Sequence, residues 1–352
     1  MKKFRFLTAG ESHGKGLTAI IEGIPAGFEV DIDFINSELS RRQQGYGRGD
    51  RMKIETDTVE ILSGVRFGKT LGSPVTLFIK NKDYENWNLE SGERAFTAYR
   101  PGHADYAGSV KYGHEDLRNV LERSSARKTA IEVAVGAIAK LILKQFGIEG
   151  RSNIIQIGES PLYKGGQGGL NEIDAAKAAG DTIGGKFEVI YDGLPVGLGS
   201  YVHWDRAIDG KLAQAMMSIP AIKAVEIGTN PLGMKGSEYH DEIFLSENQL
   251  STGIVHKTNN AGGVEGGMTN GEPLVVRAVM KPIPTMKKPL KTVDSAVMQA
   301  AEAHFERSDT CAVEAAAVVG EARVACVLVD EFLLKYGGDS LKEIEKFVNG
   351  EL

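Results

Sequence analysis

The chain has 352 residues, 42% of them hydrophobic and 25% charged, which is ordinary for a globular protein with one large domain or two medium ones. Its net charge of −6 comes from 41 Lys and Arg against 47 Asp and Glu, so it lacks the broad basic surface that sequence-independent nucleic-acid binding needs. Two cysteines, Cys311 and Cys326, are too few for a disulfide framework or a zinc site, and we expect both to be buried.

Neither a leader nor a membrane segment is predicted. The N-terminal MKKFRFLTAGESHG is basic, but its apolar run is too short for a signal peptide. The longest apolar stretch, AIEVAVGAIAKLILKQFG, carries Glu132, Lys140 and Lys144, which is not typical of a membrane span. We therefore expect a cytoplasmic protein that binds neither membranes nor nucleic acid.

Strand-like runs open the chain, and a long alanine-rich and leucine-rich helix is predicted from about Ala126 to Phe146, ending at Gly147. A polar loop is expected at 236–260, and the last helix should be interrupted at Gly320. In chain order, strands are expected at 4–10, 17–27, 52–62, 73–81, 152–160, 186–200, 224–230 and 273–285, and the other helices at 171–180, 206–220, 291–304 and 310–336.

The order of these elements indicates the fold class. Strands come in groups, with long helices between the groups rather than after every strand, which favours an α+β fold with antiparallel sheets. The helices are apolar on most faces, so we expect them to be buried between the sheets. We treat 1–352 as a single domain whose weakest seam lies near 236–260, and the sequence leaves an internal duplication open.

Two familiar nucleotide-binding patterns are absent. SGVRFGKT at 63–70 imitates a phosphate loop, but only three residues separate Gly64 from Gly68, where that loop needs four before its Gly-Lys pair. The segment is predicted to be a surface turn between two strands. No G-x-G-x-x-G stands between a strand and a helix, and the seven histidines lack the short spacings of metal ligands, so we expect no metal.

Two turns present histidines. GESHG at 10–14 places Ser12 and His13 between glycines directly after a strand, where an imidazole is accessible for proton transfer. YRPGHADYAG at 99–108 presents His103, with Arg100 before it and Asp105 after it. In each case an ordinary turn residue is the alternative, and Asp105 is equally suited to cap the next helix.

Arginines are concentrated at two further places. RRQQGYGRGDR at 41–51 has four arginines among glycines, in a segment that we expect to be flexible. ERSSARKTA at 122–130 puts two serines where a helix should begin, between two arginines. Exposed N–H groups, hydroxyls and guanidiniums together favour a phosphate or carboxylate site over a solvated helix cap.

Three later segments are weaker signals. NNAGGVEGGMTNGEP at 259–273 is a glycine-dense loop that could let a flat ring lie against the backbone, and KPIPT at 281–285 offers Lys281 to a phosphate. FERSDTCAV at 305–313 has Arg307 and Asp309 before the last helix, where an N-cap is the simpler reading of the aspartate. Together, all these segments predict a pocket for a small molecule with several negative charges.

At this point the residues resemble a known family. GESHG, RRQQGYGRGDR, SGVRFGKTLGSPV, RPGHADYAGSVKYG, ERSSARKTA, GLPVGLGS, SIPAIKAVEIG, GGVEGGMTNG and KPIPT are similar, in order and spacing, to the signature segments of chorismate synthase. The resemblance runs from about Ala9 to Glu321 and is specific, because the combination of the first, second and fourth segments is distinctive.

The resemblance implies a lyase of the shikimate pathway, the route to aromatic amino acids. Such an enzyme converts 5-enolpyruvylshikimate 3-phosphate to chorismate by 1,4-elimination of phosphate, and it needs reduced FMN although no net redox change occurs. It also implies a β-α-β sandwich, with helices between antiparallel sheets, and a homotetramer. NADPH is implied as an upstream reductant.

Roles for single residues follow from the same resemblance. His13 corresponds to a histidine that donates a proton near the flavin pyrimidine ring, His103 to an acid that assists the departing phosphate, and Asp309 to an aspartate that helps pass on the substrate proton. Ser12 and Ser125 support this relay. Arginines expected to bind substrate or NADPH are Arg42, Arg48, Arg100 and Arg127; expected flavin-binding residues are Arg123, Ser124, Ser125, Ala221, Gly266, Lys281, Pro282, Ile283, Pro284, Thr285 and Arg307.

The chain departs from the family pattern at two positions. Ser308 stands where a histidine is frequent, and Glu265 replaces an aliphatic residue of the glycine loop, so we expect its carboxylate to point away from an anionic cofactor. No added flavin-reductase segment is evident, and reduced FMN is expected from outside. Two rival hypotheses are a flavin-free phospho-lyase that uses His103 and His13 as acid and base, and an anion-binding or RNA-binding module.

Overall fold

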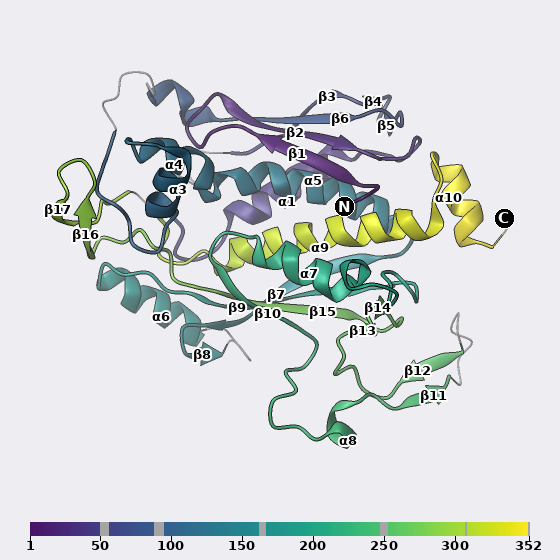
Figure 1. Cartoon of the computed structure of the whole chain (residues 1–352). Coiled ribbons are helices and arrows are strands. Elements are labelled where there is room, and N and C mark those ends of the chain that lie inside the picture. Colours follow the sequence, from purple (N-terminus) through teal and green to yellow (C-terminus); the bar gives the residue numbers. More distant parts are fainter. Residues whose placement is uncertain (50–55, 88–94, 162–166, 247–252, 307, 351–352) are drawn as a thin grey trace.

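Two antiparallel sheets face each other across a layer of long helices (Figure 1). The computed structural model describes residues 1–49, 56–87, 95–161, 167–246, 253–306 and 308–350. The strand order is β1-β2-β6-β3 in the first sheet and β10-β15-β9-β7-β8 in the second. The α+β sandwich with buried helices, predicted from the sequence, is therefore confirmed.

The first sheet lies over one side of the helices and contains the turn that carries GESHG. Apolar and polar residues alternate along its central strand, so that Val75, Leu77 and Ile79 are buried against the helices. Its strands are β1 (Arg5–Ala9), β2 (Gly16–Glu22), β3 (Glu60–Ser63) and β6 (Val75–Lys80). The expected strand at 52–62 is thus shorter, and residues 51–55 lie outside the described part of the chain.

The second sheet covers the other side of the helical layer (Figure 1). One of its inner strands, LVVRAVM, buries every second side chain, and Tyr191 from the neighbouring central strand is almost fully buried. The strands are β7 (Glu149–Ile157), β8 (Ser160–Pro161), β9 (Gly185–Asp192), β10 (Ile222–Ile227) and β15 (Leu274–Met280).

The two central helices of the layer, α5 (Thr129–Lys144) and α9 (Val313–Tyr336), are apolar and buried on nearly all faces because both sheets cover them. The backbones of α5 and α9 approach closely at Gly136, where an added Cβ would lie 2.3 Å from Ala322 Cβ. The layer consists of α1 (Ile32–Gln43), α5 (Thr129–Lys144), α7 (Ile208–Met217) and α9 (Val313–Tyr336).

The predicted interruption of the last long helix is wrong, because α9 continues through Gly320 without a break. A Cβ at this position would lie 2.8 Å from Phe187 Cε2 of the second sheet. The glycine therefore lets the helix pack closely on the sheet rather than ending it.

The predicted helix at 291–304 is also wrong. The segment forms the hairpin of β16 (Lys291–Asp294) and β17 (Gln299–Glu302). The backbone N–H of Ser295 donates to Thr97 O at 3.0 Å, and Tyr99 donates to Val293 O at 3.3 Å. These long-range bonds override the helix propensity of the alanines, which is a weak preference.

Several further elements were not predicted. Helices α3 (Asp105–Tyr112) and α4 (Arg118–Ser124) gather with the β16–β17 hairpin at one end of the sandwich (Figure 1). The expected polar loop at 236–260 contains a short helix and a hairpin that projects from the body. The remaining elements are β4 (Val65–Arg66), β5 (Lys69–Thr70), η1 (Lys82–Asn86), η2 (Ala126–Lys128), α6 (Gln167–Ala178), η3 (Trp204–Arg206), α8 (Gly236–Tyr239), β11 (Ile243–Leu245), β12 (Ile254–His256), β13 (Val264–Glu265), β14 (Met268–Thr269) and α10 (Leu341–Val348).

Three negative expectations can be compared with the structure. The segment 63–70 is the β4–β5 hairpin, with Phe67 and Gly68 at positive φ in its turn, so it is not a phosphate loop. Cys311 and Cys326 are free and buried, and burial raises the pKa of Cys326 to about 12, which makes it unreactive near neutral pH. Among the described residues, no helix has the length and apolar character needed to cross a membrane.

Candidate active site

The turn between β1 and β2 presents Ser12 and His13 at one end of the sandwich. The glycine at position 10 is required, because it has φ +108° and an added Cβ would lie 2.3 Å from Gly16 O. The Ser12 N–H donates to Glu122 O at 2.8 Å, and Asn81 Nδ2 donates to Gly14 O at 2.7 Å. The turn is therefore fixed by α4 and by the end of β6.

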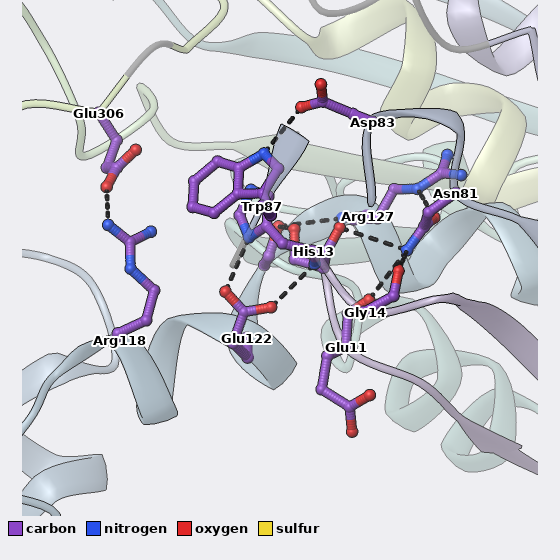
Figure 2. Close-up of polar contacts among 12 residues, drawn as sticks. Glu11, His13, Gly14, Asn81, Asp83, Trp87, Arg118, Glu122, Arg127 and Glu306 are labelled. Carbon is purple, nitrogen blue, oxygen red and sulfur yellow. Dashed lines mark hydrogen bonds and ion pairs between the residues drawn. The ribbon is translucent and has the colours of Figure 1, made fainter. Parts of the chain in front are cut away.

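His13 is held on two sides (Figure 2). Its Nδ1 lies 2.7 Å from Glu122 Oε1, and its backbone N–H donates to Glu122 Oε2 at 2.8 Å. The Trp87 ring stacks on the imidazole with 3.6 Å between centroids and 26° between planes. Both His13 and Glu122 are buried, so solvent screens their interaction weakly.

The two serines of ERSSARKTA lie at a junction where one helix ends and the next begins. Ser124 ends α4, and Ser125 caps the short η2 by accepting from the Arg127 N–H at 3.3 Å. Ser12 Oγ donates to Ser125 Oγ at 3.2 Å, which joins the two serines expected to act together. Ser124 Oγ is buried without a hydrogen-bond partner in the described part of the chain.

Two arginines converge beside this junction. Arg127 donates from Nε to Asn81 Oδ1 at 2.9 Å and from Nη1 to Asp57 Oδ2 at 2.7 Å. Arg42 comes from the last turn of α1, which places it on a helix and not on a flexible segment. Its Nη1 lies 3.9 Å from Asp57 Oδ2, and its Nε donates to Thr129 Oγ1 at 2.9 Å.

A third arginine brings Asp309 to the same region. Arg48 Nε lies 3.2 Å from Asp309 Oδ2, and the Gly49 N–H donates to Asp309 Oδ1 at 2.6 Å. The alternative that Asp309 caps the last helix is wrong, because the N-cap of α9 is Ala312. Burial lowers the pKa of Arg42 to about 10; Asp57 opposes this shift, while the nearby charges of Arg127 and Arg48 add to it. The cluster is thus dense enough for its cations to repel one another.

Arg100, His103 and Asp105 form a second group. Asp105 is fully buried and accepts from Arg100 Nη2 at 2.7 Å and from Arg100 Nε at 2.8 Å. His103 Nδ1 lies 2.9 Å from Asp105 Oδ1 and 3.1 Å from Arg100 Nη2. Burial favours the neutral carboxyl, but the hydrogen bonds from Arg100 and His103 prevail and hold the pKa of Asp105 well below its usual value. The turn therefore pairs its histidine with a carboxylate.

A row of stacked side chains joins the two groups. Arg118 lies over the Trp87 ring at 5.3 Å and over the Phe96 ring at 5.1 Å. Arg100 lies over the same phenylalanine ring at 5.2 Å. Figure 2 shows Arg118 and its partner Glu306 on the side of Trp87 away from Arg127. The row connects the environment of His13 to that of Arg100 and His103.

The KPIPT segment lies against the turn that carries His103. Lys281 Nζ donates to Gly102 O at 2.5 Å, and the Lys281 N–H donates to Ala221 O at 2.9 Å. Ser308 Oγ donates to Thr285 O at 2.6 Å, which ties the residue before Asp309 to the same segment. The structure therefore places Ala221 and the segment from Lys281 to Thr285, with Pro282, Ile283 and Pro284 inside it, beside the turn that carries His103.

Two further residues expected to bind flavin, Arg123 and Gly266, lie in different parts of the fold. Arg123 donates to Thr8 O at 2.8 Å and to Gly10 O at 3.1 Å, so it lies along β1 and is exposed. Gly266 is in the β13–β14 turn, and that hairpin lies at the opposite end of the sandwich from α3 and α4 (Figure 1). Its neighbour Glu265 contacts His256 Nε2 and Asn270 Nδ2, both at 3.1 Å. Arg307 lies outside the described residues.

The sequence did not reveal several residues that organise the site. Glu122 was only part of the segment at 122–130, and Asn81 was only the last residue of the strand expected at 73–81. Asp57, Trp87 and Arg118 carried no motif, because each acts through a partner far away in the chain. The 70 positions between Asp57 and Arg127 show why spacing could not predict such a pair.

The arrangement can perform acid–base chemistry on a polyanion. Two imidazoles, each paired through Nδ1 with a carboxylate, lie in one connected region with Arg42, Arg100 and Arg127. No group of three metal-ligating side chains occurs among the residues described. The catalytic and binding roles given to these residues remain predictions.

Comparisons with known proteins identify the family of this chain. The chain is 54% identical over 347 residues to chorismate synthase of Thermoanaerobacter pseudethanolicus, covering 97% of this chain and 96% of that protein. It is 51% identical over 386 residues to chorismate synthase of Geotalea daltonii, with coverage of 99% and 98%. A solved structure described as the crystal structure of chorismate synthase superposes with a TM-score of 0.80 at 43% identity, covering 100% of this chain and 98% of that one. The family model described as chorismate synthase matches residues 4–333, so the chain belongs to the chorismate synthase family.

Proposed function

We propose that this protein catalyses the 1,4-trans elimination of phosphate from 5-enolpyruvylshikimate 3-phosphate, giving chorismate with no net redox change. It would act as a carbon–oxygen lyase at the last common step of the shikimate pathway. The observation that carries the proposal is that both histidine–carboxylate pairs lie in one connected region with the arginine cluster, in a chain of this family.

Charge supports the choice of substrate. A molecule with two carboxylates and a phosphate needs dense positive charge to offset its own repulsion. Arg42, Arg100 and Arg127 are buried and come from three separate segments of the chain. With Arg48, they would bind these anionic groups; Arg42 and Arg48 would also hold NADPH as an upstream reductant.

The residues present fit reduced FMN. The buried Ser124 Oγ has no hydrogen-bond partner among the described residues, and an unpaired buried polar group costs roughly 1–3 kcal/mol. Ser124 and Ser125, with Ala221 and the segment from Lys281 to Thr285, would hold the cofactor. When bound, reduced FMN supplies electron density to the allylic system of the substrate as the phosphate leaves.

The side chains of this chain would handle the protons. His103, oriented by Asp105 through Nδ1, would protonate the departing phosphate. Asp309, held by Arg48 and by the Gly49 N–H, would carry the substrate's ring proton away from the site. His13 would donate a proton beside the cofactor, and Ser12 and Ser125 would support it through their mutual hydrogen bond.

An anaerobic assay of the whole protein tests the function. The purified chain is mixed with 5-enolpyruvylshikimate 3-phosphate and reduced FMN, and chorismate and inorganic phosphate are measured. We expect equal amounts of both products, and none without reduced FMN. Full activity without flavin would instead support a phospho-lyase in which His103 and His13 act alone.

The lack of any product, together with tight and strongly salt-dependent binding to a random oligonucleotide, would support the anion-binding or RNA-binding alternative. We further propose a cytoplasmic homotetramer. Native mass spectrometry of the protein with FMN would measure its subunit number, and a monomer at assay concentration would refute the tetramer.

A further inference from the structure

The carboxylate of Glu122 contacts His13 twice. One oxygen accepts from the His13 backbone N–H at 2.8 Å, and the other lies 2.7 Å from the imidazole Nδ1. In Figure 2 the carboxylate of Glu122 points toward the histidine from α4, and both side chains are only 8% exposed. The two contacts fix both the position of the turn and the rotation of the ring.

The chemistry of the pair fixes the tautomer as well. An ionised carboxylate can only accept hydrogen bonds, so Nδ1 must carry the proton that joins it to Glu122. In the protonated imidazole both nitrogens carry a proton. Because Nδ1 is engaged by Glu122, Nε2 is the atom through which the ring exchanges a proton with a ligand.

Trp87 restricts the ring from a second direction. Its indole stacks on the imidazole at 3.6 Å, and its Nε1 donates to Asp83 Oδ2 at 2.8 Å. The indole is therefore anchored by a hydrogen bond of its own, and a ring flip of His13 would break the bond to Glu122 while sliding against this surface. The histidine is held in one orientation.

From this geometry we infer that Glu122 is a positioning residue, which keeps the proton of His13 on Nδ1 and directs Nε2 to the reacting molecules. The inference rests on the proposed function, in which His13 donates a proton beside the cofactor. After Nε2 gives up its proton, the ring is left as the Nδ1–H tautomer that Glu122 stabilises. Glu122 itself touches no substrate.

The variant Glu122→Gln separates this role from simple support of the turn. The glutamine has the same shape, and its carbonyl oxygen can still accept from the His13 backbone N–H. Its amide NH₂ then faces Nδ1 as a donor, so the histidine is forced into the Nε2–H tautomer. The substitution keeps the backbone of the turn in place, but it moves the proton of the neutral imidazole from Nδ1 to Nε2.

Two measurements are made on the whole protein. Nitrogen-15 NMR of the resting protein, recorded at a pH where the His13 ring is neutral and with the His13 resonances assigned by a His13→Gln variant, reports the tautomer without any turnover. We expect Nδ1–H in the wild type and Nε2–H in Glu122→Gln. Steady-state kinetics with reduced FMN should show kcat lowered about 10²-fold, with little change in the KM for substrate.

A matched control is available at His203, whose Nδ1 lies 2.7 Å from Asp205 Oδ1 on the surface. Asp205→Asn makes the same chemical change to an exposed histidine–carboxylate pair and should leave kcat unchanged. Glu122→Asp keeps a carboxylate opposite Nδ1, so it should retain the Nδ1–H tautomer and recover part of the lost turnover.

The outcomes are distinct. An Nε2–H tautomer in the wild type, or normal kcat in a Glu122→Gln protein whose tautomer has reversed, would overturn the inference. If Glu122→Gln does not fold, the wild-type tautomer and the kcat of Glu122→Asp test the inference instead. An Nε2–H tautomer in the wild type would overturn it. A Glu122→Asp protein that has the Nδ1–H tautomer but no activity would also overturn it. A wild type that makes no chorismate refutes the proposed function, while the tautomer measurement still tests the geometry.

Discussion

Asp57 and Arg127 form a buried ion pair, with 2.7 Å between Oδ2 and Nη1, at the centre of the arginine cluster. The same oxygen lies 3.9 Å from Arg42 Nη1. One carboxylate thus lies between two guanidiniums that would otherwise repel each other, while the Nε of Arg127 is held separately by Asn81. The positively charged pocket depends on this negative charge.

Asp57→Asn should lower the free energy of unfolding by about 3–5 kcal/mol, because it leaves buried cations without their counter-charge. Substrate should also bind more weakly, since Arg42 and Arg127 are no longer held together. Urea unfolding and isothermal titration with the phosphorylated substrate measure the two effects. Asp192→Asn, which breaks an exposed pair with Arg151, is the control and should change stability by only about 0–1 kcal/mol. Equal losses in both variants would contradict the role of Asp57.

Glu306 should make stability depend on pH in the acid range. Burial raises its pKa, but the hydrogen bonds from His304 and Arg118 prevail and lower it from 4.5 to about 2. Because the folded-state pKa lies below the ordinary value, the stabilisation is fully present above pH 4.5 and is lost as the pH falls toward 2.

Glu306→Gln should therefore be less stable than the wild type near neutral pH, with a difference that shrinks as the pH falls from 4.5 to about 2. Unfolding free energies measured across this range check the expectation. Glu242→Gln, at an exposed pair with Lys257, is the matched control. A Glu306→Gln difference that stays constant down to pH 2 would show that the carboxylate is not stabilised by its charge.

Much of the architecture could be predicted from the sequence, because it follows from local patterns. The strand-like runs that contain β6 and β15 and the apolar length of α5 identified strands and a buried helix. The helix at 291–304 was predicted wrongly, because its alanines favour a helix whereas its hydrogen bonds to Thr97 and Tyr99 are tertiary. Where packing decides, a local pattern is insufficient.

The candidate site shows the same division. Histidines beside glycines and clustered arginines are visible in the sequence, so His13, His103 and Arg127 could be chosen as candidates. Their carboxylate partners differ in distance along the chain. Asp105 is two residues from His103 and could be recognised beside it, whereas Glu122 is 109 residues from His13 and could not. Long-range pairs form only when the sheets and helices bring the segments together.

His103→Ala should lower kcat by about 10²-fold or more while the KM for substrate changes little, as expected for the loss of a general acid. The guanidinium of Arg100 keeps its two hydrogen bonds to Asp105 in this variant, so the anion-binding group stays in place. Steady-state kinetics with reduced FMN measure both constants. His203→Ala, which removes an exposed histidine, is the control. A raised KM with normal kcat would assign His103 to binding alone.

The fluorescence of Trp87 offers a direct test of whether the ligands bind beside His13. The chain has two tryptophans, and Trp204 is 81% exposed, so Trp204→Phe leaves an indole that stacks on His13 as the only fluorophore of its kind. Adding the phosphorylated substrate or FMN should change its emission, because either ligand alters the polarity beside the ring. The double variant Trp87→Phe, Trp204→Phe corrects for ligand absorption. If the ligands bind by calorimetry while the Trp87 emission stays unchanged, the binding pocket lies away from His13.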